Sequence, residues 1–343
     1  MAEKKRFFYG WLILLTCILI MGLGYAPLVS CASLFTKPVT EDLGFTRSGY
    51  ALVSTIAALM MAFMSPFIGK IMSKPYMHKA LVVCMIGNCL AYYCYSFAST
   101  LPQFYVTAAC IGFFECGSTM IPVSVLITNW FRKKRGLVMS IAMVGSSIGG
   151  TILSPIIGNL IASQGWRFTY KAVGITRLVI LVPLVLLVIR RTPADMGTKA
   201  YGADEEGETG KARKTEREWN VSLKEVKKKP MFWCFVLGCT LISATAAVIT
   251  HIPASVMDAG YSNTTAACIA SLYLFIAIPG KLVLGHIYDR YGVKSGILFG
   301  NTMFFLSVVC LIFIKHQPFL YLMAILFGFG TCIGTVSAPV ITS

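Results

Sequence analysis

Long apolar runs separated by short polar segments dominate this chain. A helix needs about 20 consecutive apolar residues to cross the hydrocarbon core of a bilayer. Runs of that length predict ten transmembrane helices, at residues 8–34, 48–69, 79–98, 103–130, 137–162, 168–190, 231–257, 264–287, 295–314 and 318–341. The first run is too long for a cleaved signal peptide. The expected fold class is therefore an all-α membrane protein.

One polar segment, 192–230, differs from the other loops because it is long, charged and poor in large apolar residues. This composition is typical of a solvated linker. It divides the chain into an N-terminal six-helix bundle at 1–191, a cytoplasmic linker at 192–230 and a C-terminal bundle of about four helices at 231–343.

Lysine and arginine mark one side of the predicted membrane. They cluster at the amino terminus and in the even-numbered loops, at Lys4, Lys5, Arg6, Lys70, Lys74, Lys79, Arg132, Lys133, Lys134, Arg135, Arg190 and Arg191. Short cytoplasmic loops carry this excess of positive charge. The pattern predicts a multi-pass protein of the plasma membrane with a cytoplasmic N-terminus.

Composition supports this picture and excludes other classes. The chain is 56% apolar and only 13% charged, unlike a water-soluble enzyme. The net charge of +16 lies in the loops, so it reflects topology and not a nucleic-acid partner. The 12 cysteines fall within apolar runs, as buried thiols do. The sequence contains no zinc-ligand spacing, P-loop, nucleophile elbow or haem motif, so we expect no enzyme, metal or cofactor.

Two cytoplasmic loops share a pattern. The loop after the second span, 69–79, and the loop after the eighth, 285–294, both begin with glycine, contain a central basic residue and end with lysine. Internal repeats of this kind are typical of secondary transporters.

The second of these loops resembles the loop signature of the major facilitator superfamily. The matching residues are Gly285, Asp289, Arg290 and Gly292. The resemblance implies a cytoplasmic latch, in which the Asp accepts from helix N-terminal amides and the Arg offers a fork of donors. The first loop has Ser73 and Tyr76 at the Asp and second Gly positions, so a weaker latch is expected there. The family fold has six plus six spans, so we expect the C-terminal bundle of this chain to be incomplete.

Four further segments resemble the monocarboxylate porters and the oxalate/formate antiporter group. They are 33–48, 129–136 with the glycines that follow it, 165–167, and 193–202. Gly145, Gly149 and Gly150 in the fifth span place small residues on one helix face, which predicts close helix packing.

Ionisable residues inside apolar spans are costly and are functional candidates by default. Lys281 in span eight stands where these groups hold an arginine that pairs with the substrate carboxylate. Lysine keeps the positive charge of that arginine but lacks its bidentate fork of donors. The alternative to a substrate-binding role is that the Lys281 side chain extends to the membrane interface. Ala277 stands where the proton-coupled porters carry an acidic residue. We therefore do not expect this chain to couple protons through the same residue.

Two other charges lie within spans. Glu115 in span four is a candidate proton site or the partner of a buried cation. Arg177 in span six is a candidate structural partner of Glu115. Weaker polar candidates for substrate contact are Tyr25, Tyr273 and His251.

These residues predict a transporter that moves small organic anions by alternating access, as an antiporter or a proton symporter. Its expected partners are the anion, the lipid bilayer and, for symport, protons. Two alternatives stay open: an exporter of apolar or cationic compounds that uses Glu115, and a membrane scaffold or sensor that transports nothing.

Overall fold

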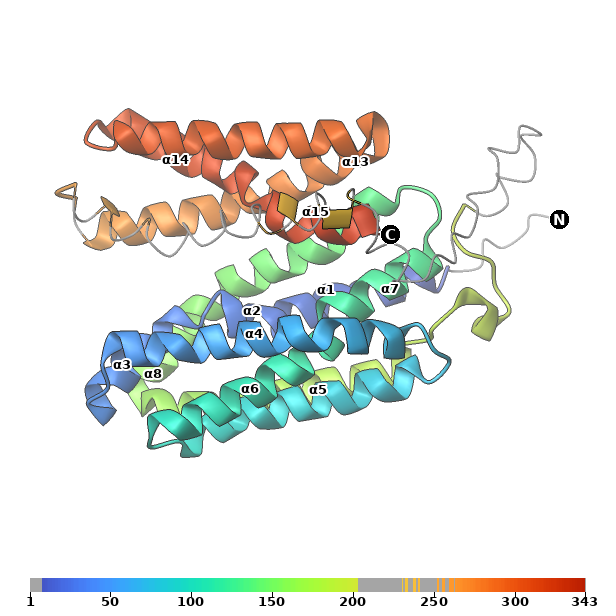
Figure 1. Ribbon diagram of the computed structural model, residues 1–343, viewed down its shortest axis with the longest axis horizontal. Helices are drawn as coiled ribbons and strands as arrows, with labels where there is room; N and C mark the ends of the chain where they lie inside the picture. Colours follow the sequence, from blue (N-terminus) through green and yellow to red (C-terminus); the bar gives the residue numbers. More distant parts are fainter. Residues whose placement is uncertain are drawn as a thin grey trace. The chain divides into compact units, whose positions relative to one another are not determined.

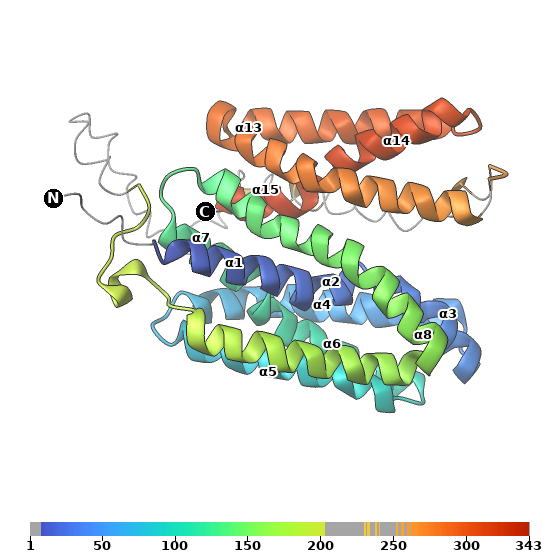
Figure 2. The ribbon, with the colours of Figure 1, turned by 180° about the vertical axis from the view of Figure 1, so that it is seen from behind.

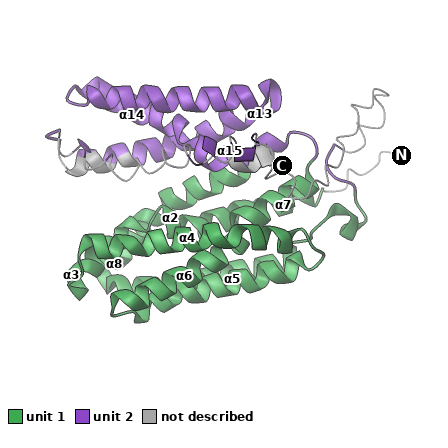
Figure 3. Cartoon of the chain, in the orientation of Figure 1, with its two compact units in different colours: residues 1–131, 141–198, 343 green, residues 132–140, 199–342 purple. Residues whose placement is uncertain are grey.

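The computed structural model describes residues 8–202, 230, 232–233, 237–238, 240, 252, 255–256, 259–261 and 263–342. Every regular element in these ranges is a helix (Figures 1 and 2). The chain forms two compact units, of which unit 1 comprises 1–131, 141–198 and 343, and unit 2 comprises 132–140 and 199–342 (Figure 3).

Unit 1 contains most of the described helices. Their bounds are α1 Gly10–Leu19, η1 Ile20–Tyr25, α2 Ala26–Val29, α3 Ser33–Leu43, α4 Arg47–Met72, α5 Met77–Cys94, η2 Tyr95–Phe97, α6 Leu101–Ser118, α7 Met120–Trp130, α8 Arg135–Val188 and η3 Pro193–Met196. The first turn of α8 belongs to unit 2. Helices α4, α5 and α6 run side by side (Figure 1).

Unit 2 contains α13 Asn263–Ile312, α14 Gln317–Gly330 and α15 Cys332–Thr342. In the described residues of the whole chain, seven helical stretches are long and apolar enough to cross a membrane. They include nine of the ten predicted spans, because α8 and α13 each hold two. The predicted span 231–257 and the linker residues 203–229 lie mostly or wholly outside the described residues.

The two longest helices are broken at a single glycine. Gly165 in α8 has φ 79° and ψ 166°, and Gly292 in α13 has φ 82° and ψ 172°. Residues with a side chain are strained at these positive φ angles, whereas glycine adopts them readily. A single glycine therefore turns the chain at each break without a loop. The sequence prediction placed short loops at these positions, and the structure reduces each of them to one kinked residue.

The first predicted span continues beyond its expected end at residue 34. Helical structure runs with short interruptions to Leu43, where Gly44 with φ 68° ends α3. Within this stretch, Ile20–Tyr25 form a π-helix, η1. A second irregularity divides the fourth span at Thr119 between α6 and α7. Pro122 supports that break, because proline cannot donate to the carbonyl four residues earlier.

Aromatic side chains fill much of the core of unit 1. Tyr170 lies between Phe35, whose ring centroid is 4.0 Å away, and Tyr92 and Tyr95, both at 5.1 Å. In unit 2, Tyr273 packs edge-on against Phe327 at 5.3 Å. The described cysteines are free thiols, most of them buried as predicted, with Cys94, Cys110 and Cys268 exposed.

Candidate functional site

Arg177 lies at the centre of a buried polar cluster in unit 1. Its side chain on α8 is only 2% exposed. One guanidinium nitrogen, Nη2, donates to the Gly24 carbonyl at 2.9 Å and to Oδ1 of Asn88 on α5. The guanidinium carbon lies 5.0 Å from the ring centroid of Tyr92. The cluster therefore joins three spans around one cation.

Arg177 reaches the backbone of the first span within its π-helical turn. A π-helical turn carries an extra residue and shifts the hydrogen bonds of an α-helix, which allows carbonyls to accept from elsewhere. Gly24 lies within η1 and its oxygen accepts from Arg177. Such turns occur frequently at functional sites.

Glu115 lies on α6 just before the break in the fourth span and is 7% exposed. Its backbone carbonyl accepts from the hydroxyl of Thr119 at 2.9 Å. Its carboxylate is within electrostatic range of Arg177 and of Tyr25. The structure thus brings three predicted site residues, Tyr25, Glu115 and Arg177, into one region of unit 1.

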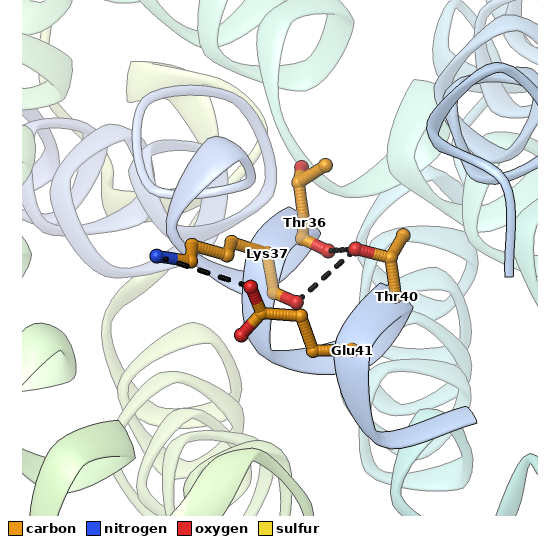
Figure 4. Close-up of polar contacts among 4 residues, drawn as sticks. All are labelled: Thr36, Lys37, Thr40 and Glu41. Atoms are coloured by element: carbon orange, nitrogen blue, oxygen red, sulfur yellow. Dashed lines mark hydrogen bonds and ion pairs between the residues drawn. The ribbon is translucent and has the colours of Figure 1, made fainter. Parts of the chain in front are cut away.

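The suggested pairing of Arg177 with Glu115 is not a direct ion pair. Among the described residues, the only ion pair within 4.0 Å joins Lys37 and Glu41, on the exposed surface of α3 (Figure 4). The Gly24 carbonyl and Asn88 occupy one edge of the Arg177 guanidinium. Arg177 therefore donates these hydrogen bonds to neutral oxygens.

Lys281 lies in unit 2, inside the apolar first half of α13, and is 4% exposed. The start of α15 packs beside it, with the Cys332 thiol donating to the Gly328 carbonyl at 3.1 Å and lying within electrostatic range of Lys281. Such burial stands against a lysine that snorkels into water. Tyr273, two turns earlier, belongs to the apolar cluster around Phe327, and His251 lies outside the described residues.

Asp289 caps the beginning of α8. Its two carboxylate oxygens accept from the backbone amides of Gly136 and Leu137, each at 2.8 Å. Gly285, one turn earlier on α13, has no room for a side chain, because a Cβ would stand 2.8 Å from the Gly136 carbonyl oxygen. Arg290 lies over the ring of Tyr291 at 5.5 Å. Within unit 2, α13 and the first turn of α8 therefore meet through a carboxylate placed at a helix N-terminus.

The first copy of the loop uses a different contact. Ser73 ends α4, and its carbonyl accepts from Nη2 of Arg191 at 2.8 Å. An arginine thus contacts a loop carbonyl, whereas in the second copy a loop carboxylate contacts helix amides. The charge of the contact is reversed between the two copies.

The segments that carry the resemblance fasten the two ends of unit 1. At one end, Asn129 and Trp130 donate to the carbonyls of Arg191 and Arg190, at 3.1 and 2.9 Å. Toward the other end, Trp166 donates to Asp42 at 3.0 Å, and Arg167 donates to the Ser96 carbonyl at 2.9 Å. These motifs therefore act first as structural contacts between helix ends.

Replacing Trp130 by Phe tests one of these contacts. Trp130 is fully buried, and its indole N–H donates to the Arg190 carbonyl. We expect Trp130→Phe to lower stability by about 1–3 kcal/mol, because the partly buried Arg190 carbonyl loses its donor and the smaller ring leaves space. The melting temperature of the purified protein measures this loss. An unchanged melting temperature would show that the contact contributes nothing.

A family model described as Major Facilitator Superfamily matches residues 12–343. The chain belongs to the Major Facilitator Superfamily. This membership confirms the resemblance predicted from the loop signature. With the seven long apolar helices in the described residues, it supports a multi-pass membrane protein.

Individual relatives within the superfamily are distant. The chain is 26% identical to the MFS-type transporter pytF of Aspergillus terreus over 61% of its own length and 62% of that protein. It is 24% identical to monocarboxylate transporter 4 of Gallus gallus, covering 81% of this chain and 56% of the relative. It is 23% identical to monocarboxylate transporter 12 of Mus musculus, and the match covers 98% of this chain and 73% of the relative. The chain thus spans between about half and three quarters of these relatives.

Solved structures agree with the major facilitator fold. The chain superposes on a bacterial homologue of the human lysosomal transporter Spinster, in an inward-facing and unoccupied conformation, with a TM-score of 0.62. The two are 17% identical, and the match covers 98% of this chain and 75% of that one. At this identity the likeness describes the fold alone.

Asn88 was not among the site residues predicted from the sequence of this major facilitator protein. It is fully buried in α5 and holds Arg177. The signal in the sequence was a polar amide side chain within an apolar span. Its partner, Arg177, lies on a distant span, so no local spacing of residues links the two. The same holds for Gly24, which contributes only its backbone oxygen.

Proposed function

We propose that this protein is a secondary active transporter of small organic anions, such as monocarboxylates or oxalate and formate. It works by alternating access, as an antiporter or a proton symporter. The observation that carries the proposal is Lys281, a cation 4% exposed inside an apolar span. A buried cation within a membrane span favours an anionic partner and marks a substrate path by default.

Other features support the same class of substrate. Two of the relatives are named monocarboxylate transporters. Lysine presents a point charge without the bidentate fork of arginine, so the site would favour small carboxylates over those that require two parallel hydrogen bonds. Tyr25, Tyr273 and His251 are proposed as secondary contacts for the substrate.

Glu115 is the proposed coupling group. A carboxyl group in low-dielectric surroundings holds a proton more readily than one in water. Glu115 is 7% exposed and makes no ion pair within 4.0 Å in the described part of the chain. Proton symport would use this group, whereas exchange of one anion for another would leave it unchanged.

The proposed organisation has an N-terminal bundle at 1–191, a cytoplasmic linker at 192–230 and a C-terminal bundle from 231. Gly285, Asp289, Arg290 and Gly292 form a proposed cytoplasmic latch that opens and closes during transport. The proposed location is the plasma membrane, with the N-terminus in the cytoplasm. Lys and Arg in the even-numbered loops support this orientation.

The substrate class is tested by flux into liposomes that contain the purified protein. Radiolabelled formate, oxalate and lactate are offered singly, with an unlabelled anion or a proton gradient on the other side. We expect Lys281→Ala to reduce anion flux at least tenfold, since the cation that attracts the substrate is lost. Lys281→Arg keeps the charge and is expected to retain measurable flux with altered preference among the anions.

The matched control is Lys37→Ala, which removes a lysine whose side chain is 73% exposed and is expected to leave flux unchanged. Retained anion flux in Lys281→Ala would overturn the assignment. Flux that is lost in Glu115→Gln but retained in Lys281→Ala would favour the alternative that uses Glu115, an exporter of apolar or cationic compounds. No flux of any solute would favour a membrane scaffold or sensor.

A further inference from the structure

The cluster around Arg177 contains more donors than acceptors. In the described residues, Nε and Nη1 of Arg177, Nδ2 of Asn88 and the hydroxyl of Tyr92 are buried without a hydrogen-bond partner. The three side chains are 2%, 0% and 2% exposed. Such orphaned polar atoms in a native interior are rare and require an explanation, such as an ion or ordered water.

These atoms belong to one site because the three residues contact each other through Arg177. The guanidinium donates to Asn88 and lies over the Tyr92 ring. A guanidinium only donates, so the atom of Asn88 that it contacts is the carbonyl oxygen. The Asn88 amide nitrogen is therefore also a donor. The tyrosine hydroxyl is able to donate as well, so each of the four atoms can donate to an acceptor bound in this cluster.

The charge of the site points the same way. A buried cation without a counter-ion in contact is strongly unfavourable, and each orphaned donor adds the cost of its lost hydration. Glu115 lies within electrostatic range of Arg177 but forms no ion pair with it. Water would satisfy the donors but would leave the charge. A small anion satisfies both.

We propose that Arg177, Asn88 and Tyr92 form a binding site for one small monovalent anion, of the size of chloride or formate, within unit 1. The site lies on α5 and α8 and is distinct from Lys281 on α13, so it does not depend on the proposed transport function. The negative charge of Glu115 opposes the bound anion. Occupancy of the site and ionisation of Glu115 therefore weaken each other.

Anion-dependent melting of the purified chain tests this site. The melting temperature is measured in detergent while sodium chloride or sodium formate replaces sodium gluconate at constant ionic strength. Gluconate, a much larger anion than chloride or formate, serves as the reference salt. We expect the melting temperature to rise with chloride or formate and to saturate, because an anion that binds only the folded state stabilises it.

The variants separate an anion site from a general salt effect. Asn88→Asp places a carboxylate against Arg177, so the anion-dependent rise should disappear or need at least tenfold more anion. Tyr92→Phe removes one donor and should raise the half-saturating concentration severalfold. Glu115→Gln removes the opposing charge and should lower the half-saturating anion concentration severalfold. The control Lys37→Ala removes an exposed cation and should leave it unchanged.

The proposal is overturned if chloride and formate stabilise the protein no more than gluconate does. It is also overturned if Tyr92→Phe and Glu115→Gln both keep the wild-type half-saturating concentration, which would assign ordered water to the cluster. Gel filtration checks that each variant is folded. If Asn88→Asp does not fold, the opposite shifts expected for Tyr92→Phe and Glu115→Gln decide the result.

Discussion

Replacing Gly149 by Ala should prevent unit 1 from forming its native packing. Gly149 lies on α8 where that helix crosses η1, and a Cβ at this position would stand 2.6 Å from the Cα of Gly22 and 2.7 Å from its carbonyl carbon. Both are backbone atoms, so no side-chain rotation relieves the overlap. The two helices must separate, at a cost on the order of 3 kcal/mol or more. We expect a sharp loss of monodisperse protein and of melting temperature.

The matched control lies on the same helix. Gly158 is also a helical glycine of α8, but a Cβ there meets nothing within 4 Å. Alanine has the higher helix propensity, so Gly158→Ala should be neutral or should stabilise by up to about 1 kcal/mol. Gel filtration and thermal melting compare the two variants side by side. Equal behaviour of Gly149→Ala and Gly158→Ala would show that the close crossing is not required.

This crossing also shows what the sequence predicts well. Gly145 and Gly149 lie four positions apart, so they share a helix face, and that spacing predicts a close helix contact. The apolar runs likewise predicted the helical spans that the structure describes, because bilayer thickness sets the length of a span. These predictions succeed because they rest on local spacing along one helix.

Contacts between distant spans were predicted less well. Glu115 was a candidate structural partner of Arg177. The structure keeps it within electrostatic range, but Arg177 donates its hydrogen bonds to Gly24 and Asn88. Which groups face each other depends on the rotation of each helix about its axis and on the π-helix in the first span. Neither is visible as a periodic pattern in an apolar run. The break at Thr119 was also missed, although Pro122 was its signal.

Asp289→Asn should uncouple the beginning of α8 from α13. The Asp289 carboxylate accepts from the amides of Gly136 and Leu137, which have no partner within their own helix. Asparagine retains one oxygen, but its NH₂ group would face the other amide, donor against donor. The negative charge at the helix N-terminus is also lost. We expect a loss of about 1.5–3 kcal/mol, since hydrogen bonds to charged groups are the stronger kind.

Hydrogen exchange locates the effect. Amides at 136–140 should exchange faster in Asp289→Asn, while those of the Arg177 cluster in unit 1 should be unaffected. The matched control is Glu41→Gln, an equivalent carboxylate-to-amide change in the exposed pair with Lys37, at 3.9 Å (Figure 4). Exposed pairs contribute at most about 1 kcal/mol, so this variant should melt near the wild-type temperature. If both variants melt and exchange alike, the Asp289 cap does not hold the two helices together. If only Asp289→Asn loses protection at 136–140, the carboxylate is what fastens α8 to α13, and the latch proposed for transport has its structural basis there.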